Sequence, residues 1–102
     1  MEDANVPYSL NLPSKLKSQG WKVKIRDKER LEPPHVTVWH WEEMWRICLR
    51  TRGFLVPPGG SWKGIDAEVR EIIEKAWKTL CDAWDAKYPE NPISSLEEED
   101  NA

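Results

Sequence analysis

Apolar and polar residues alternate in three stretches in the middle of the chain, 21–26, 35–41 and 45–50. A period of two residues is typical of strands that bury one face of a sheet. The second stretch is also rich in β-branched and aromatic residues, which favour strands. Short connections between the stretches favour antiparallel pairing of neighbours. The pattern therefore predicts a three-stranded antiparallel sheet.

A different period follows in the C-terminal part of the chain. Between residues 65 and 84, apolar residues recur at steps of three and four, which places a wide apolar stripe on one side of a helix of roughly twenty residues. Asp66 suits its start, because the helix dipole favours negative charge there, and Pro89 ends it. A shorter helix is expected over 14–19, closed by Gly20.

The order of elements is therefore short helix, three strands and long helix. This is an α+β fold (α-β-β-β-α) in which the long C-terminal helix packs on one face of a three-stranded antiparallel sheet. A chain of 102 residues is enough for one domain and too short for two. We expect an N-terminal arm over 1–12, a single α+β domain over 13–89 and a disordered acidic tail over 90–102.

Several classes of protein are excluded by what the sequence lacks. It contains no apolar stretch long enough for a membrane helix, and its first residues lack the basic start and apolar stretch of a secretory signal. We therefore expect a cytoplasmic protein with no membrane partner. Cys48 and Cys81 lie far apart and belong to no cluster with zinc spacing, so we expect free thiols, no metal and no cofactor.

Charge is distributed unevenly along a chain whose net charge is −3. Residues 15–63 contain eleven lysines and arginines against five acidic residues, a local charge of +6. Residues 64–102 contain eleven acidic and four basic residues, a local charge of −7. A locally basic region attracts a polyanion even where the whole protein is acidic.

The face of the sheet that the helices leave uncovered would be basic and aromatic. Cations neutralise phosphates, and aromatic rings stack on unpaired bases. We therefore predict a nucleic-acid-binding face formed by Lys22, Lys24, Arg26, Thr37, Trp39, Trp41, Arg46, Arg50 and Arg52. The same pattern is typical of an ordinary solvated face, and that interpretation stays open. A slip of one residue in the strand 35–41 would exchange its two faces.

His35 is the candidate catalytic residue. It follows two prolines and lies beside the basic face, whereas His40 falls on the opposite face by parity. Histidine titrates near neutral pH, so it can serve as a general acid or base. If the protein is an enzyme, we expect RNA cleavage that uses His35. An ordinary surface histidine is the alternative.

Two resemblances bear on function. The run Glu32-Pro33-Pro34-His35-Val36-Thr37-Val38, followed by Arg52-Gly53-Phe54-Leu55 and a closing Trp84, resembles a small bacterial family known only as a domain of unknown function. Its members carry a Pro-Pro-His-x-His-Val signature before a strand, and the resemblance covers about residues 20–86. This chain has Thr37 where the family often has a second histidine.

The order of elements is also similar to that of HicA-type toxins, which cleave messenger RNA on a double-stranded-RNA-binding-like fold. In that family a Gly-Ser-His segment carries the histidine, and here Pro34-His35 stands in the place of Ser-His. The resemblance implies RNA-binding ancestry more than it implies cleavage.

The leading hypothesis is a small RNA-binding or toxin–antitoxin-associated protein. The alternative is a protein-interaction module with a protein partner or a homodimer and no nucleic-acid role. Seven tryptophans are many for so small a core, and tryptophan with arginine is typical of interface centres. An enzyme acting on a small metabolite ranks last, because the sequence has no glycine-rich cofactor loop and no nucleophile motif.

Overall fold

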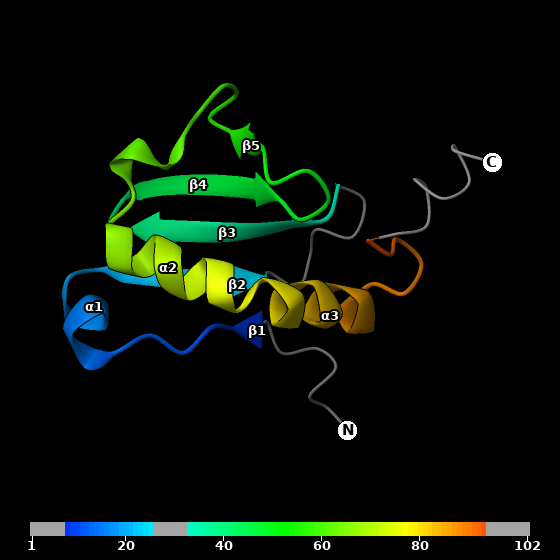
Figure 1. Cartoon of the computed structure of the whole chain (residues 1–102), viewed down its shortest axis with the longest axis horizontal. Helices are drawn as coiled ribbons and strands as arrows, with labels where there is room; N and C mark the ends of the chain where they lie inside the picture. Colours follow the sequence, from blue (N-terminus) through cyan, green and yellow to red (C-terminus); the bar gives the residue numbers. More distant parts are fainter. Residues whose placement is uncertain (1–7, 26–32, 94–102) are drawn as a thin grey trace.

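A five-stranded antiparallel sheet forms the centre of the computed structural model, which describes residues 8–25 and 33–93 (Figure 1). Each strand is hydrogen-bonded to its neighbour in the sequence, so the sheet is an antiparallel meander. The strands are β1 (Tyr8–Ser9), β2 (Trp21–Ile25), β3 (His35–His40), β4 (Glu43–Cys48) and β5 (Phe54–Val56).

One helix lies between β1 and β2, and the other helices follow β5. They are α1 (Ser14–Ser18), the short 3₁₀ helix η2 (Trp62–Gly64), α2 (Ala67–Lys75) and α3 (Trp77–Lys87). Figure 1 shows α2 and α3 following one another across one face of the sheet. Asp66 caps α2, because its carboxylate accepts hydrogen bonds from the N–H groups of Glu68 (2.8 Å) and Val69 (3.4 Å). None of the helices in the described ranges has the length and apolar character needed to cross a bilayer.

The core lies between α2, α3 and the sheet face that they cover. The residues that fill it are all 9% exposed or less, and each contributes about 1.5–3 kcal/mol when it is fully buried. Those from the sheet are Trp21, Val23, Ile25, Val36, Val38, Trp45 and Ile47, and those from the helices are Leu16, Val69, Ile73, Trp77, Leu80 and Trp84. Because the sheet residues alternate with the basic ones, the opposite face carries the polar side chains.

The predicted fold class is wrong in two respects, and the first is the number of strands. The sheet has five strands and not three, because β1 and β5 add one edge strand on each side. These strands contain two and three residues, which is too few for an alternation to be recognised. They are held by backbone pairing with β2 and β4, a contact that leaves no pattern in the sequence.

The second error concerns the single long helix, which is divided at Ala76 into α2 and α3. Ala76 has φ −97° and ψ 11°, in the bridge region outside the helical range. Its N–H is shared between the carbonyls of Ile72 (3.0 Å) and Ile73 (3.2 Å), an arrangement common at helix ends. The apolar stripe continues across the break without proline or glycine, so the sequence pattern does not reveal it.

Both ends of the described chain pack on the domain. β1 lies within the segment assigned above to an arm, yet it pairs with β2. At the other end, the indole Nε1 of Trp84 donates a hydrogen bond to the carbonyl of Asn91 at 2.7 Å. The remainder of the expected arm and tail, 1–7 and 94–102, lies outside the described residues.

Candidate functional site

The sheet face opposite α2 and α3 carries side chains whose positions are set by strand register. Lys22 of β2 lies opposite Trp39 of β3. Lys24 lies opposite Thr37, which in turn lies opposite Arg46 of β4. Directly opposed residues on neighbouring strands are close enough to touch. These five residues therefore lie side by side on this side of the sheet, called here the basic face.

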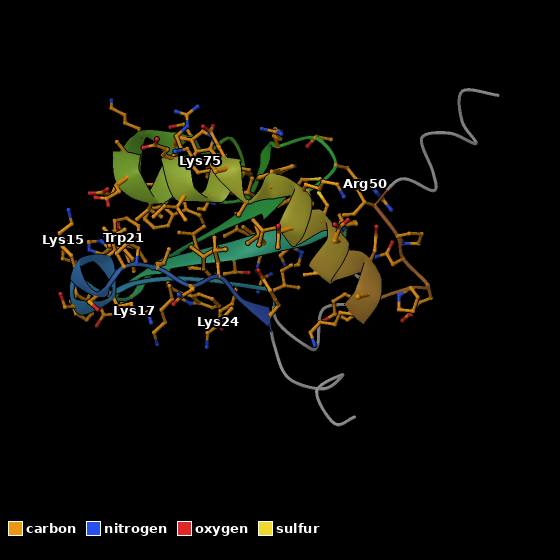
Figure 2. All side chains as sticks on the ribbon, turned by 60° about the horizontal axis from the view of Figure 1, so that its bottom comes forward. Lys15, Lys17, Trp21, Lys24, Arg50 and Lys75 are labelled. Carbon is orange, nitrogen blue, oxygen red and sulfur yellow. The ribbon has the colours of Figure 1, made fainter. Side chains whose placement is uncertain are left out.

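A groove adjoins this face at the β3–β4 turn. It has a volume of about 230 Å³ and is called here the tryptophan groove. Its lining residues are Lys17, Gly20, Lys22, Lys24, Trp39 and Trp41. In Figure 2, Lys17 and Lys24 extend to the same side of the molecule, away from α2 and α3. A neighbouring cavity of about 360 Å³ shares the three lysines and is otherwise lined by residues 9–12, Trp21 and Val23.

Trp41 forms the rim of the tryptophan groove and is 66% exposed, the one large apolar side chain classed as exposed in the part of the chain that the structure describes. It stands first in the two-residue turn between β3 and β4 and has φ 54°. Left-handed backbone is uncommon for a bulky residue. Its N–H donates to the carbonyl of Gly20 at 3.1 Å, which ties the turn to the end of α1.

Gly20 supports the ring of Trp41. A Cβ at this position would collide with the six-membered part of the indole, so the ring lies directly against the glycine backbone. Gly20 also has φ 93°, a conformation that favours glycine on its own account. The absence of a side chain therefore serves both the turn after α1 and the placement of Trp41.

Within 8–25 and 33–93, no carboxylate pairs with Lys17, Lys22 or Lys24. Elsewhere on the described surface, four ion pairs at 3.0–3.1 Å join Lys15 to Glu68, Arg70 to Glu74, Lys75 to Glu71 and Lys78 to Asp82. The hydrogen bond to Glu68, followed by its charge, raises the pKa of Lys15. Exposed Glu42, in the β3–β4 turn, and exposed Glu43, at the start of β4, do not line the groove.

The structure encloses His35, the candidate catalytic residue. The residue is 1% exposed, and its Nδ1 is 2.8 Å from the carbonyl oxygen of Pro33. Its ring packs against Trp84 of α3, with ring centroids 5.6 Å apart. An RNA backbone does not reach a ring enclosed in this way. His35 is also absent from the lining of the groove.

Three further predicted residues are buried or engaged in contacts within the domain. Thr37 is fully buried within the basic face. Arg50 donates hydrogen bonds to the carbonyls of Ile93 and Pro92, and Figure 2 places it at the end of the molecule away from Lys17. The guanidinium of Arg52 lies 4.5 Å from the ring centre of Trp77, as a cation–π pair.

The remaining predicted residues divide between the groove and the rest of the chain. Lys22, Lys24, Trp39 and Trp41 line the groove. Arg46 is half-buried in the basic face, and Arg26 lies outside the described residues.

Sequence reasoning missed Lys17 and Gly20 as members of the site. One feature of the sequence could have indicated Lys17, which follows the apolar residue Leu16. Leu16 is buried, so its neighbours on this short helix point outward. Gly20 was expected to end the helix over 14–19. Its contact with Trp41 joins the connection after α1 to the turn between β3 and β4. No local pattern indicates such a contact.

Comparison with known proteins gives no match to a protein-family model, to a curated protein or to a solved structure. The two resemblances noted from the sequence are therefore neither supported nor excluded. In the described part of the chain, no group of three or more histidine, cysteine, aspartate or glutamate side chains is arranged to hold a metal ion.

Proposed function

We propose that this protein binds RNA through the tryptophan groove and the adjoining basic face. The observation that carries the proposal is that three lysines without ion-pair partners in the described chain line one groove with two tryptophans. Lysines bind phosphates as point charges, and indole rings offer a surface on which bases stack. The combination is typical of proteins that hold a nucleic-acid backbone without reading its sequence.

The number of lysines sets the expected salt dependence. If each of Lys17, Lys22 and Lys24 neutralises one phosphate, log K falls against log salt with a slope of roughly −2 on a single strand and roughly −3 on a duplex. Binding of this kind is weak at physiological salt, with a Kd on the order of 10⁻⁴ to 10⁻⁶ M. The affinity of the protein for RNA is therefore expected to fall quickly as the salt concentration rises.

The proposal is restricted to binding. RNA cleavage was expected to use His35, whose ring is enclosed by Pro33 and Trp84. The likeness to HicA-type toxins rested on the same histidine and on an order of elements with three strands. A toxin–antitoxin role therefore gains no support from the groove.

The test is RNA binding by the full chain and by charge variants, measured by fluorescence anisotropy with a short labelled RNA. Raising the salt from about 50 to about 200 mM should weaken wild-type binding by roughly 20-fold. Replacing Lys17, Lys22 and Lys24 together by glutamine should abolish most binding and flatten the salt slope. Lys63→Gln is the matched control, because Lys63 is exposed and lies outside the groove. Equal loss in the Lys63 variant, or an unaffected triple variant, would sink the proposal.

A protein-interaction surface is the second candidate, favoured by the exposure of Trp41. Tryptophan is enriched at the centres of protein interfaces. A second copy of the chain is the partner that the purified protein itself can reveal. Sedimentation that detects dimers in the wild type and monomers after Trp41→Asn would favour this function over RNA binding. Monomers in both proteins would contradict a homodimer built on Trp41.

A further inference from the structure

The placement of Trp41 bears on which form of nucleic acid fits the tryptophan groove, and this step rests on the proposed function. One face of the indole lies against Gly20, while 66% of the residue is exposed. The ring also lies 6.2 Å from that of His40, tilted by 34°, and the exposed remainder of its surface can accept a planar group. Base–aromatic stacking of this kind is tolerant of base identity, because every base has a π-face.

The size of the groove limits what else can bind there. Pockets that enclose a whole small-molecule ligand have volumes of about 300–1,000 Å³. The tryptophan groove, at about 230 Å³, is smaller than this range and therefore suits one part of a larger ligand. Its walls require that part to be planar where it meets Trp41 and anionic where it meets the lysines. A nucleobase with its neighbouring phosphates has both properties.

A duplex does not offer a base in this way. Paired bases are stacked on both faces inside the helix, and double-stranded RNA presents its phosphates, 2′-hydroxyls and groove shape. A single strand has bases that can turn outward and stack on an aromatic ring. We therefore propose that the groove binds single-stranded nucleic acid, with one unpaired base on Trp41 and adjacent phosphates near Lys17, Lys22 and Lys24.

The backbone of the turn supports this role for Trp41. A φ of 54° suits glycine or asparagine better than a bulky aromatic residue. Residues held in unfavourable conformations gather at functional sites, where the surroundings fix them. Here the surroundings are the Gly20 carbonyl, which accepts the N–H of Trp41, and the Gly20 backbone beneath the ring. The backbone of this turn would be more stable with glycine or asparagine than with tryptophan, yet the turn holds an indole ring at this position.

The experiment compares two ligands and two variants of the full chain. The ligands are a short single strand and a blunt duplex of the same sequence, each tested by anisotropy at low salt. Trp41→Asn removes the ring with a residue that tolerates left-handed backbone, and Trp41→Phe keeps an aromatic ring. We expect tighter binding of the single strand than of the duplex. Trp41→Asn should weaken single-strand binding by about 5- to 100-fold without changing the salt slope, and Trp41→Phe should retain most of the affinity.

The outcomes separate this inference from the proposed function. Equal binding of single strand and duplex, unchanged by Trp41→Asn, would overturn the inference while the lysine variants still test RNA binding. Binding of neither ligand would overturn both. If Trp41→Asn does not fold by circular dichroism, quenching of wild-type tryptophan fluorescence decides instead. Quenching by the single strand and not by the duplex is expected, and equal quenching by both contradicts base stacking on Trp41.

Discussion

The Nε of Arg50 donates a hydrogen bond of 2.7 Å to the main-chain carbonyl of Ile93, 43 residues later in the sequence. A terminal nitrogen of the same guanidinium donates to the carbonyl of Pro92 at 2.6 Å. Arg50 thus fastens the segment that follows α3 to the end of the sheet. A side chain expected to meet phosphate is instead occupied within the fold.

Arg50→Gln should therefore lower stability and leave RNA binding almost unchanged. Hydrogen bonds that involve a charged group contribute about 1.5–3 kcal/mol, and partial exposure places this one toward the lower end. Urea denaturation measures the free energy of unfolding. Lys63→Gln serves again as the control, with an expected change within about 0.5 kcal/mol. Reduced RNA affinity in a fully stable Arg50→Gln protein would return Arg50 to the binding surface.

Thr37→Val should stabilise the protein. Thr37 is 0% exposed, and its Oγ1 has no hydrogen-bond partner within the described residues. A buried polar group without a partner costs about 1–3 kcal/mol, and valine keeps the branched shape without the hydroxyl. A gain of about 1 kcal/mol would raise Tm by about 4–8 °C in a domain of this size.

Differential scanning calorimetry of Thr37→Val and of Thr79→Val checks this expectation. Thr79 is the matched control, since it is exposed on α3 and loses no buried hydroxyl. A Tm for Thr37→Val at or below that of the wild type would show that the Thr37 hydroxyl has a partner in solution.

Gly20→Ala should lower the free energy of unfolding by more than the cost of placing alanine in left-handed backbone. Gly20 has φ 93°, and left-handed backbone costs an alanine about 1–2 kcal/mol. The new Cβ would also displace the Trp41 ring. Gly59→Ala separates the two effects, because Gly59 has φ 75° and nothing within 4 Å of the added Cβ.

Urea denaturation of both glycine variants measures the difference. In the Trp41→Asn background, the extra cost of Gly20→Ala should disappear, since the obstructing ring is gone. Equal costs for Gly20→Ala and Gly59→Ala in the wild-type background would contradict the contact between Gly20 and Trp41.

Cys81 should react slowly with alkylating reagents at pH 8. Burial raises the pKa of its thiol, with smaller contributions from Asp85 and Asp82, and the thiolate is the reactive form. Mass spectrometry after timed exposure to iodoacetamide should find Cys81 modified more slowly than an unstructured cysteine. Cys48, at 6% exposure, should be slower still. Denaturation in urea should remove both differences, and fast labelling of native Cys81 would contradict its burial.

The same pKa shift affects stability at alkaline pH. The folded state holds the Cys81 proton more tightly than the unfolded chain, whose thiol has a pKa near 9.0. The unfolded chain therefore loses this proton first as the pH rises. The resulting stabilisation is complete below that pH and is lost as the pH rises through the folded pKa, which urea denaturation over a pH series measures. Cys81→Ala should remove this part of the pH dependence.

Periodic patterns in the sequence predicted the three central strands and a helical region after them, but not the break at Ala76 or the short edge strands β1 and β5. Alternation identified β2, β3 and β4 and placed Lys22 and Lys24 on the face away from the helices. It also carried the third strand as far as Arg50, whereas β4 begins at Glu43 and ends at Cys48. Parity also placed His35 beside the basic face, but parity does not show that Trp84 covers its ring. Contacts between distant segments decide which side chains are buried, and such contacts leave no local pattern in a single sequence.

The meander has a consequence for how the chain reaches this structure. Every hydrogen-bonded pair of strands is consecutive in the sequence, and β3 joins β4 through a turn of two residues. Closing a short loop costs little chain entropy, so each strand can be added to a hairpin that already exists. Proteins whose contacts are local fold faster than sheets that pair distant segments. We expect the β3–β4 hairpin to form early, β2 to join it, and the Arg50–Ile93 connection to close last.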